Sequence, residues 1–226
     1  MNIPRPYSLQ SKFILRLIAI LMLISVINLT GLYYFMQDTV DEEVSTRATI
    51  VLKQVDAVQK YVQTRLRPKM IEVLPDSFVL EAMSSSFISR SIMETVDTAD
   101  ADYVYRRVAI NARNPVFEAN EVERELIAYF QNNQDEEIWQ GLKDIDEQRV
   151  FVMARPVRFV ESCMLCHGKF DEAPVEMTGQ YGERGFGHPL DSIGGVDLVG
   201  IPTDRYAVKT MAEFSLYVLV YLIISV

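Results

Sequence analysis

An uncharged segment of twenty residues, Leu17 to Met36, lies near the N-terminus of this chain. As a helix with a rise of about 1.5 Å per residue, it measures about 30 Å, which matches the hydrocarbon thickness of a bilayer. We therefore expect a transmembrane helix over residues 13–36. A cleaved signal peptide is the alternative, but its apolar region would be shorter and would end at a small-residue cleavage site, whereas this segment runs on through Tyr33 and Tyr34.

The charges on either side of the segment predict its orientation. Arg5, Lys12 and Arg16 precede it, and a group of acidic residues begins at Asp38. Under the positive-inside rule, residues 1–12 lie in the cytoplasm and the rest of the chain lies on the other side of the membrane.

A second apolar run closes the sequence. Phe214 to Val226 is thirteen uncharged residues, which is too short to cross a bilayer. We expect residues 212–226 to be the start of a second transmembrane helix, leading out of a helix that Thr203 caps. The sequence would then be the front part of a longer protein.

The part between the two apolar runs is acidic. All 31 acidic residues follow the first run, whereas three of the 22 basic residues precede it, so this part carries a net charge of −12. A surface of this kind argues against nucleic acid or anionic lipid as a partner. Its length, roughly 175 residues, suits one compact domain with an additional helix.

A pentapeptide, Cys-Met-Leu-Cys-His, occupies residues 163–167 and contains both cysteines of the chain. Cys-x-x-Cys-His is the attachment sequence of c-type haem. The thiols of Cys163 and Cys166 would each add to a haem vinyl group, and His167 would bind the iron from the proximal side. A redox-active dithiol is one alternative. Another is a zinc site completed by His188 or a carboxylate.

Residues 37–70 have the pattern of one long helix. Valine and alanine recur at alternating intervals of four and three residues between positions 44 and 62, which is a heptad seam. The seam could pack on the domain of the same chain. It could equally pair with a second copy as a parallel homodimer, because membrane anchoring raises the effective concentration of the partner. Pro68 and Pro75 are expected to end the helix.

The remaining pattern mixes helices and strands and predicts an α+β domain of PAS-like type over residues 71–211. We expect helices over 76–97 and 118–131, strands over 103–110, 150–160 and 196–202, a turn at 114–115 and a glycine-rich loop over 179–187. The second strand leads directly into the Cys-x-x-Cys-His sequence.

Four stretches, residues 81–90, 111–123, 155–168 and 181–187, carry a resemblance to a known family. The chain resembles the membrane-anchored c-type haem sensor domains of bacteria, long catalogued as a domain of unknown function. The resemblance implies a PAS-like domain, with one covalent haem c, in the periplasm at the inner membrane. Such domains often precede histidine kinases, chemoreceptors or cyclases. Two departures are Ala112, where proline is frequent, and His188, where an aromatic residue is usual.

The sixth iron ligand is expected to separate the possible functions, because an exchangeable ligand lets a gas bind whereas a tight one favours electron transfer. Met83, in the stretch that resembles the distal helix, is the first candidate, and His188 is the alternative. Met70, water or another group is also possible. Most methionines in proteins fill apolar cores, and His188 could be an ordinary loop residue.

The haem propionates need basic partners or water. Arg113, Arg155 and Arg158 are the candidates, although each could be a solvated surface residue. Four aromatic side chains could wall the haem or build the core: Trp139, Phe159, Tyr181 and Phe186.

Two functions follow. The first is a sensor domain that detects redox state or a small gas and relays it across the membrane. The second is a tethered monohaem cytochrome that exchanges electrons with a redox partner in a membrane complex. We expect no enzyme, because the chain has no nucleophile elbow, phosphate-binding loop or dinucleotide-binding loop.

Overall fold

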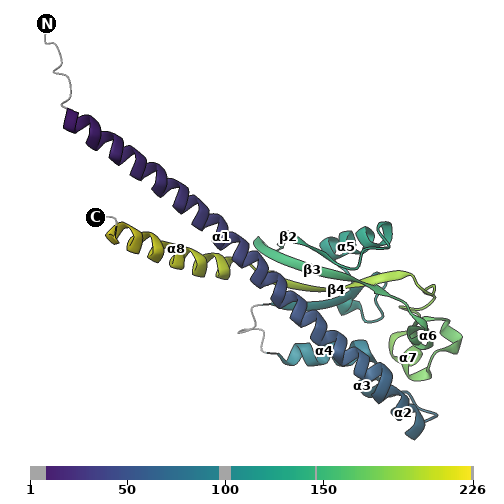
Figure 1. Cartoon of the computed structure of the whole chain (residues 1–226). Coiled ribbons are helices and arrows are strands. Elements are labelled where there is room, and N and C mark those ends of the chain that lie inside the picture. Colours follow the sequence, from purple (N-terminus) through teal and green to yellow (C-terminus); the bar gives the residue numbers. More distant parts are fainter. Residues whose placement is uncertain (1–8, 97–102, 146, 225–226) are drawn as a thin grey trace. The chain divides into compact units, whose positions relative to one another are not determined.

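The computed structural model describes residues 9–96, 103–145 and 147–224 (Figure 1). Parts of three predicted segments lie outside this range. They are residues 1–8 of the predicted cytoplasmic segment, residue 97 of the predicted helix 76–97, and residues 225–226 of the predicted second transmembrane helix. The chain divides into two compact units, Met1–Glu43 with Arg205–Val226, and Val44–Asp204. The α+β class is confirmed by a four-stranded antiparallel sheet combined with helices.

The first unit holds the N-terminal part of helix α1 (Leu9–Tyr61) and helix α8 (Asp204–Ile224). The Oγ of Ser25 and the hydroxyl of Tyr221 are 2.9 Å apart and link these two helices. Within the described residues, the helical stretch Leu9–Val73 has the length and composition needed to cross a membrane, and no residue of its most apolar window is buried. Helix α8 contains a shorter apolar run, Ala212–Tyr221.

The second unit is built on a sheet with strand order β1-β4-β3-β2. The strands are β1 (Val104–Ala109), β2 (Trp139–Ile145), β3 (Gln148–Arg158) and β4 (Ile193–Pro202). Strand β2 was not predicted. It is an edge strand that alternates between half-buried and exposed positions, and its glycine and charged residues gave no apolar pattern.

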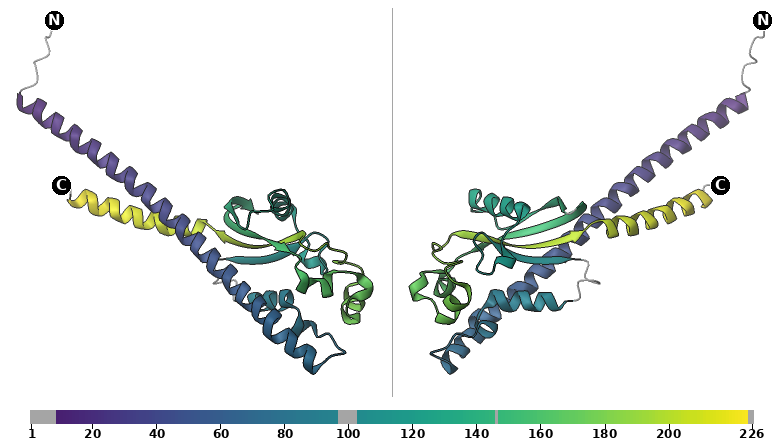
Figure 2. Two further views of the ribbon diagram at one scale, coloured as in Figure 1. Left: turned by 45° about the vertical axis from the view of Figure 1, so that its right-hand side comes forward. Right: turned by 180° about the vertical axis from the view of Figure 1, so that it is seen from behind.

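Helix α5 (Glu121–Asn132) covers one face of the sheet (Figure 2). Its Leu126, Ile127 and Phe130 are buried against alternate residues of β3 and β4 in the main hydrophobic core. Asn120 and Glu123 form a reciprocal capping box that fixes where the helix begins. This element confirms the predicted helix 118–131 to within a few residues.

Helix α1, from Val44 onward, lies on the opposite face of the sheet. The predicted seam is turned inward, since Val44, Ala48 and Val55 are at most 1% exposed. The Oγ1 of Thr49 lies 3.6 Å from the sulfur of Met153 in β3. The seam therefore packs on the domain of its own chain, and the homodimer through residues 44–62 stays an untested prediction.

The long helix does not end at Pro68. It passes through a π-helical turn, η1 (Val62–Leu66), and continues as α2 (Arg67–Val73). Proline has no backbone N–H to donate in an α-helix. A π-helical turn changes the hydrogen-bond register just before it, so Pro68 is accommodated in the first turn of α2.

The predicted helix 76–97 is two helices, α3 (Leu80–Met83) and α4 (Ser85–Thr95). They meet at Ser84, which has extended backbone and whose hydroxyl accepts a hydrogen bond from the N–H of Phe87. A serine in this position favours a helix start over a helix interior.

The segment between β3 and β4 is more helical than expected. It contains α6 (Glu161–His167), η3 (Phe170–Glu172) and α7 (Val175–Tyr181), and a further short turn, η2 (Pro115–Phe117), follows β1. Helix α7 takes up the first residues of the predicted loop 179–187. The rest of that loop is irregular, with positive φ at Gly182, Gly185 and Gly187.

Candidate functional site

Helix α6 carries the whole Cys-x-x-Cys-His sequence. It begins directly after β3, where the N–H of Cys163 donates to the carbonyl of Val160 at 2.8 Å. Residues three and four apart share one face of a helix, so Cys163, Cys166 and His167 project on the same side. This geometry suits two attachment points and one metal ligand for a planar group.

A hydrogen bond orients the imidazole of His167. Its Nδ1 lies 2.8 Å from the carbonyl oxygen of Gly185, and because a carbonyl can only accept, Nδ1 carries the proton. The lone pair is then on Nε2, the atom left for a metal. Burial, followed by the nearby Arg113 guanidinium, lowers the pKa of His167 to about 4. The ring is therefore neutral at pH 7, which is the form that binds iron.

The thiol of Cys166 lacks the character of a reactive thiol. Burial raises the pKa of Cys166, so its thiol stays protonated at neutral pH. A reactive dithiol needs a lowered pKa, because the thiolate is the nucleophile. The zinc alternative finds no support either, since the described residues contain no group of three or more His, Cys, Asp or Glu side chains placed to hold a metal ion.

A pocket of about 130 Å³, open to solvent on one side, adjoins α6. Cys163 and His167 line it together with residues from α3, α4, η2, α7 and the ends of β1, β3 and β4. Its apolar and aromatic wall includes Leu80, Phe87, Phe117, Val157, Phe159, Met177 and Tyr181.

Two glycines at the start of β4 form part of this wall. A Cβ on Gly194 would come within 2.3 Å of the Phe159 ring, and one on Gly195 would come within 2.3 Å of the Val108 carbonyl oxygen. The absence of side chains lets these strands and Phe159 pack closely beside the pocket. This part of the wall was not predicted, since glycine pairs in strands have no distinctive pattern.

The charge of the pocket wall is positive, although the domain is acidic. Arg90, Arg107 and Arg113 line it, and among the described lining residues there is no aspartate or glutamate. The Nε of Arg113 is buried without a hydrogen-bond partner in the described part of the chain. A planar apolar group with acidic substituents, such as haem, fits a wall of this composition.

Only one predicted propionate partner lines the pocket, namely Arg113. Arg155 is held by Asp197 and Asp56, and Arg158 donates to the carbonyl of Gln134, so both have partners elsewhere. Arg90 and Arg107 were missed. Arg90 lies at the end of the stretch 81–90 that carried the family resemblance, and this position is the signal that could have identified it.

The predicted sixth ligands lie beside the pocket wall. Met83 is 1% exposed and lines a neighbouring pocket with Leu165 of α6. His188 stacks on Phe159 with ring centroids 4.1 Å apart. The buried methionine that lines the pocket of Cys163 and His167 is Met177, which the sequence did not single out. The identity of the sixth ligand stays a prediction.

The fold and the site define a class of protein. It is an α+β domain in which one short helix carries two cysteines and a neutral histidine, and Cys163 and His167 of this helix line a basic, apolar pocket. The chain belongs to the Tll0287-like family, whose model matches residues 37–202. The matched range takes in the long helix from residue 37, the sheet and the whole site.

Among solved structures, the chain is similar to the cyanobacterial haem protein Tll0287. The two are 18% identical, with a TM-score of 0.53, and the match covers 71% of this chain and 95% of that one. At this identity the likeness shows a shared fold. A search of curated proteins gave no match.

Proposed function

We propose that this chain is a membrane-anchored sensor domain that carries one covalent haem c. The observation that supports this most strongly is the placement of Cys163, Cys166 and a neutral His167 on one face of α6, with Cys163 and His167 lining the pocket. In this proposal the two thiols form thioethers, and Nε2 of His167 is the proximal ligand. Haem supplies an iron that changes oxidation state and can exchange its sixth ligand. The similar cyanobacterial protein Tll0287 is a haem protein, which favours the same cofactor here.

Arg67 supports a sensing role because it joins the haem-bearing helix to the long helix. Its Nε donates to the carbonyl of Met83 at 2.7 Å, and its Nη1 donates to the carbonyl of Ser162, next to Cys163, at 3.1 Å. A shift of α3 or α6 would therefore act on α2, which continues the long helix. A two-state element biased by the site is what a sensor requires.

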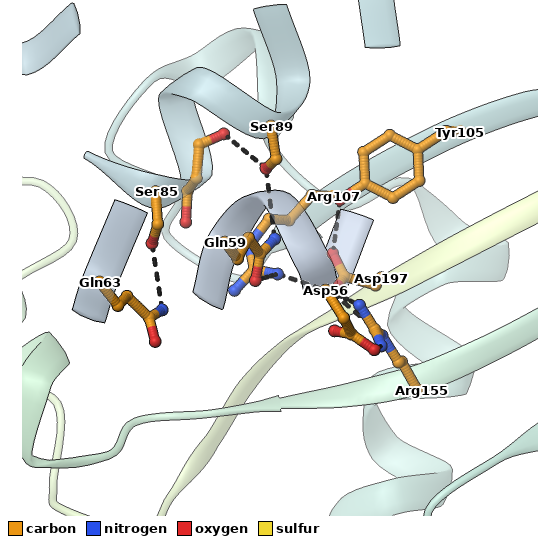
Figure 3. A network of polar contacts seen from close by, with 10 residues as sticks. Asp56, Gln59, Gln63, Ser85, Ser89, Tyr105, Arg107, Arg155 and Asp197 are labelled. Atoms are coloured by element: carbon orange, nitrogen blue, oxygen red, sulfur yellow. Dashed lines mark hydrogen bonds and ion pairs between the residues drawn. The ribbon is translucent and has the colours of Figure 1, made fainter. Parts of the chain in front are cut away.

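A buried polar network joins the long helix to α4 and to the sheet (Figure 3). Gln59 of α1 donates to the hydroxyl of Ser89 at 3.2 Å and accepts from Arg107 at 3.4 Å. Arg107 and Arg155 both pair with Asp197 of β4. Because Arg107 also lines the pocket, this network is a second route from the pocket to α1.

The proposed topology places the domain in the periplasm and anchors it in the bacterial inner membrane. The exposed apolar helix and the basic residues before it support this orientation. The stimulus in the proposal is a change of redox state or the binding of a small gas at the sixth iron position. No enzymatic activity is proposed.

The first experiment is to express the chain with a haem-maturation system and to record spectra of denatured and native protein. The wild type should carry haem that resists acid–organic extraction. The Cys163→Ala and Cys166→Ala variants should each keep a single thioether, and the double variant should lose its haem on extraction. A wild-type chain without covalent haem would refute the cofactor assignment.

The sensing role is tested by hydrogen exchange of the long helix. Exchange over residues 44–61 should differ between the ferric protein and the ferrous protein with or without carbon monoxide. Arg67→Gln should reduce that difference, whereas Lys69→Gln, on the same helix in an exposed pair with Glu72, should not. Identical exchange in all redox and ligand states would favour a tethered electron carrier instead.

A further inference from the structure

We propose that Arg90 and Arg113 hold the two propionate groups of the haem, one guanidinium for each carboxylate. The proposal rests on the haem assignment above. It adds a residue, Arg90, to the site and excludes Arg155 and Arg158 from it.

Arg90 reaches the pocket from α4. Its guanidinium carbon lies over the Phe117 ring, 3.8 Å from the ring centroid. Burial, followed by the nearby Arg107, lowers the pKa of Arg90. Glu94, one turn further along α4, contributes an attractive charge, but among the described residues it forms no ion pair with Arg90.

Arg113 also lies against an aromatic ring. Its guanidinium carbon lies 4.4 Å from the centroid of the Phe186 ring. Nη2 donates to the carbonyl oxygens of Cys166 and Gly185, the latter at 3.2 Å. Its buried Nε has no acceptor among the described residues. A buried donor without a partner is costly, and a carboxylate would satisfy it.

The third arginine of the pocket wall is already neutralised. Nη1 of Arg107 lies 2.6 Å from a carboxylate oxygen of Asp197. Within the described residues, the wall therefore has two arginines without a carboxylate partner, Arg90 and Arg113, and haem brings two carboxylates. A planar guanidinium stacked on an aromatic ring still presents its N–H edge, which matches a carboxylate in a forked geometry.

The reduction potential of the bound haem tests the proposal, because thioethers would keep the haem in place when an arginine is lost. A nearby positive charge favours the ferrous form. Arg90→Gln and Arg113→Gln should therefore each lower the potential, by an amount on the order of a tenfold change in the oxidised-to-reduced ratio, or about 59 mV. Arg90→Lys keeps the positive charge and should therefore have a reduction potential close to that of the wild type. Arg158→Gln is the matched control and should leave the potential unchanged.

A second measurement uses noncovalent binding by the Cys163→Ala/Cys166→Ala chain. This chain should bind haem at least about tenfold more tightly than haem dimethyl ester, because the ester cannot form charged hydrogen bonds. Arg90→Gln should reduce the preference. Covalent haem with unchanged potentials and no preference for the free acid would overturn the arginine assignment alone, whereas a chain that never takes up haem would overturn the cofactor assignment as well.

Discussion

The Nδ1 atom of His167 donates to the carbonyl oxygen of Gly185 at 2.8 Å, and the same carbonyl accepts from Nη2 of Arg113 at 3.2 Å. One backbone oxygen thus orients both the proposed iron ligand and a proposed propionate partner. Glycine suits this position for two reasons. Its φ of +71° lies in the left-handed region, and any other residue would place a Cβ 3.1 Å from the Cβ of Arg113. The loop that follows α7 is therefore part of the site.

Gly185→Ala should disturb this arrangement. An L-residue in the left-handed region costs roughly 1–2 kcal/mol, and the added methyl presses on Arg113. Gly187→Ala is the matched control, since its φ is +73° but no described atom lies within 4 Å of an added Cβ. Both variants should lose stability in urea unfolding, and Gly185→Ala should lose at least as much as Gly187→Ala. Only Gly185→Ala should alter the ligand-field spectrum of the haem, and equal spectra would contradict the orienting role.

Asp197→Asn should strongly destabilise the domain. Asp197 is 3% exposed and pairs with Arg107 at 2.6 Å and with Arg155 at 3.1 Å. Removing its charge leaves the buried Arg107 guanidinium without a carboxylate partner and leaves Arg155 with Asp56 alone, which costs about 3–5 kcal/mol. Urea unfolding at pH 7 measures the loss. Glu72→Gln removes the carboxylate of an exposed pair with Lys69 and should have little measurable effect.

Tyr105 should make the domain sensitive to alkali. Burial, followed by the charge of Asp197, raises the pKa of this phenol above its ordinary value of about 10. The folded state therefore keeps the proton that the unfolded state releases, so the stabilisation is complete below pH 10 and falls as the pH rises above it. Tyr105→Phe should unfold with a flatter dependence between pH 9 and pH 11. Tyr61→Phe, at an exposed position, should behave like the wild type.

Met83→Leu tests the predicted sixth ligand with little change in volume. The substitution removes the sulfur and should cost less than about 1.5 kcal/mol in stability. We expect the haem to stay attached through Cys163 and Cys166. The spectral signature of methionine ligation to the iron should disappear, and carbon monoxide should bind faster. Met177→Leu, at a buried residue that lines the pocket, is the comparison. A spectral change in Met177→Leu alone would move the ligand to α7. No change in either variant would direct attention to His188.

Local patterns in the sequence were sufficient for the elements whose partners are close in the chain. The apolar face of α5 identified that helix, and partial alternation of apolar residues identified β3. The break at Ser84 and the passage of the helix beyond Pro68 were missed. The helix break depends on the hydrogen bond that Ser84 accepts, and the continuation past Pro68 depends on the π-helical turn before it. The spacing of apolar residues predicts neither feature.

Some residues of the candidate site could likewise be predicted from local sequence, and others could not. Residues 163–167 carry their chemistry in five consecutive positions, so Cys163, Cys166 and His167 could be named without a structure. Arg90 and Arg113 come from α4 and from the loop after β1, and the pocket brings them together. Arg155 could not be separated from Arg113 by sequence, because only the register of β3 with β4 places it beside Asp197.

The sequence by itself determined the apolar N-terminal helix, the α+β class and the Cys-x-x-Cys-His site, because each depends on the composition or the spacing of neighbouring residues. Tertiary structure decided that the seam of α1 packs on its own sheet and that, among the described residues, the pocket wall carries two arginines without carboxylate partners. These features depend on contacts between residues far apart in the chain. The strand register and the packing of helices on the sheet determine those contacts.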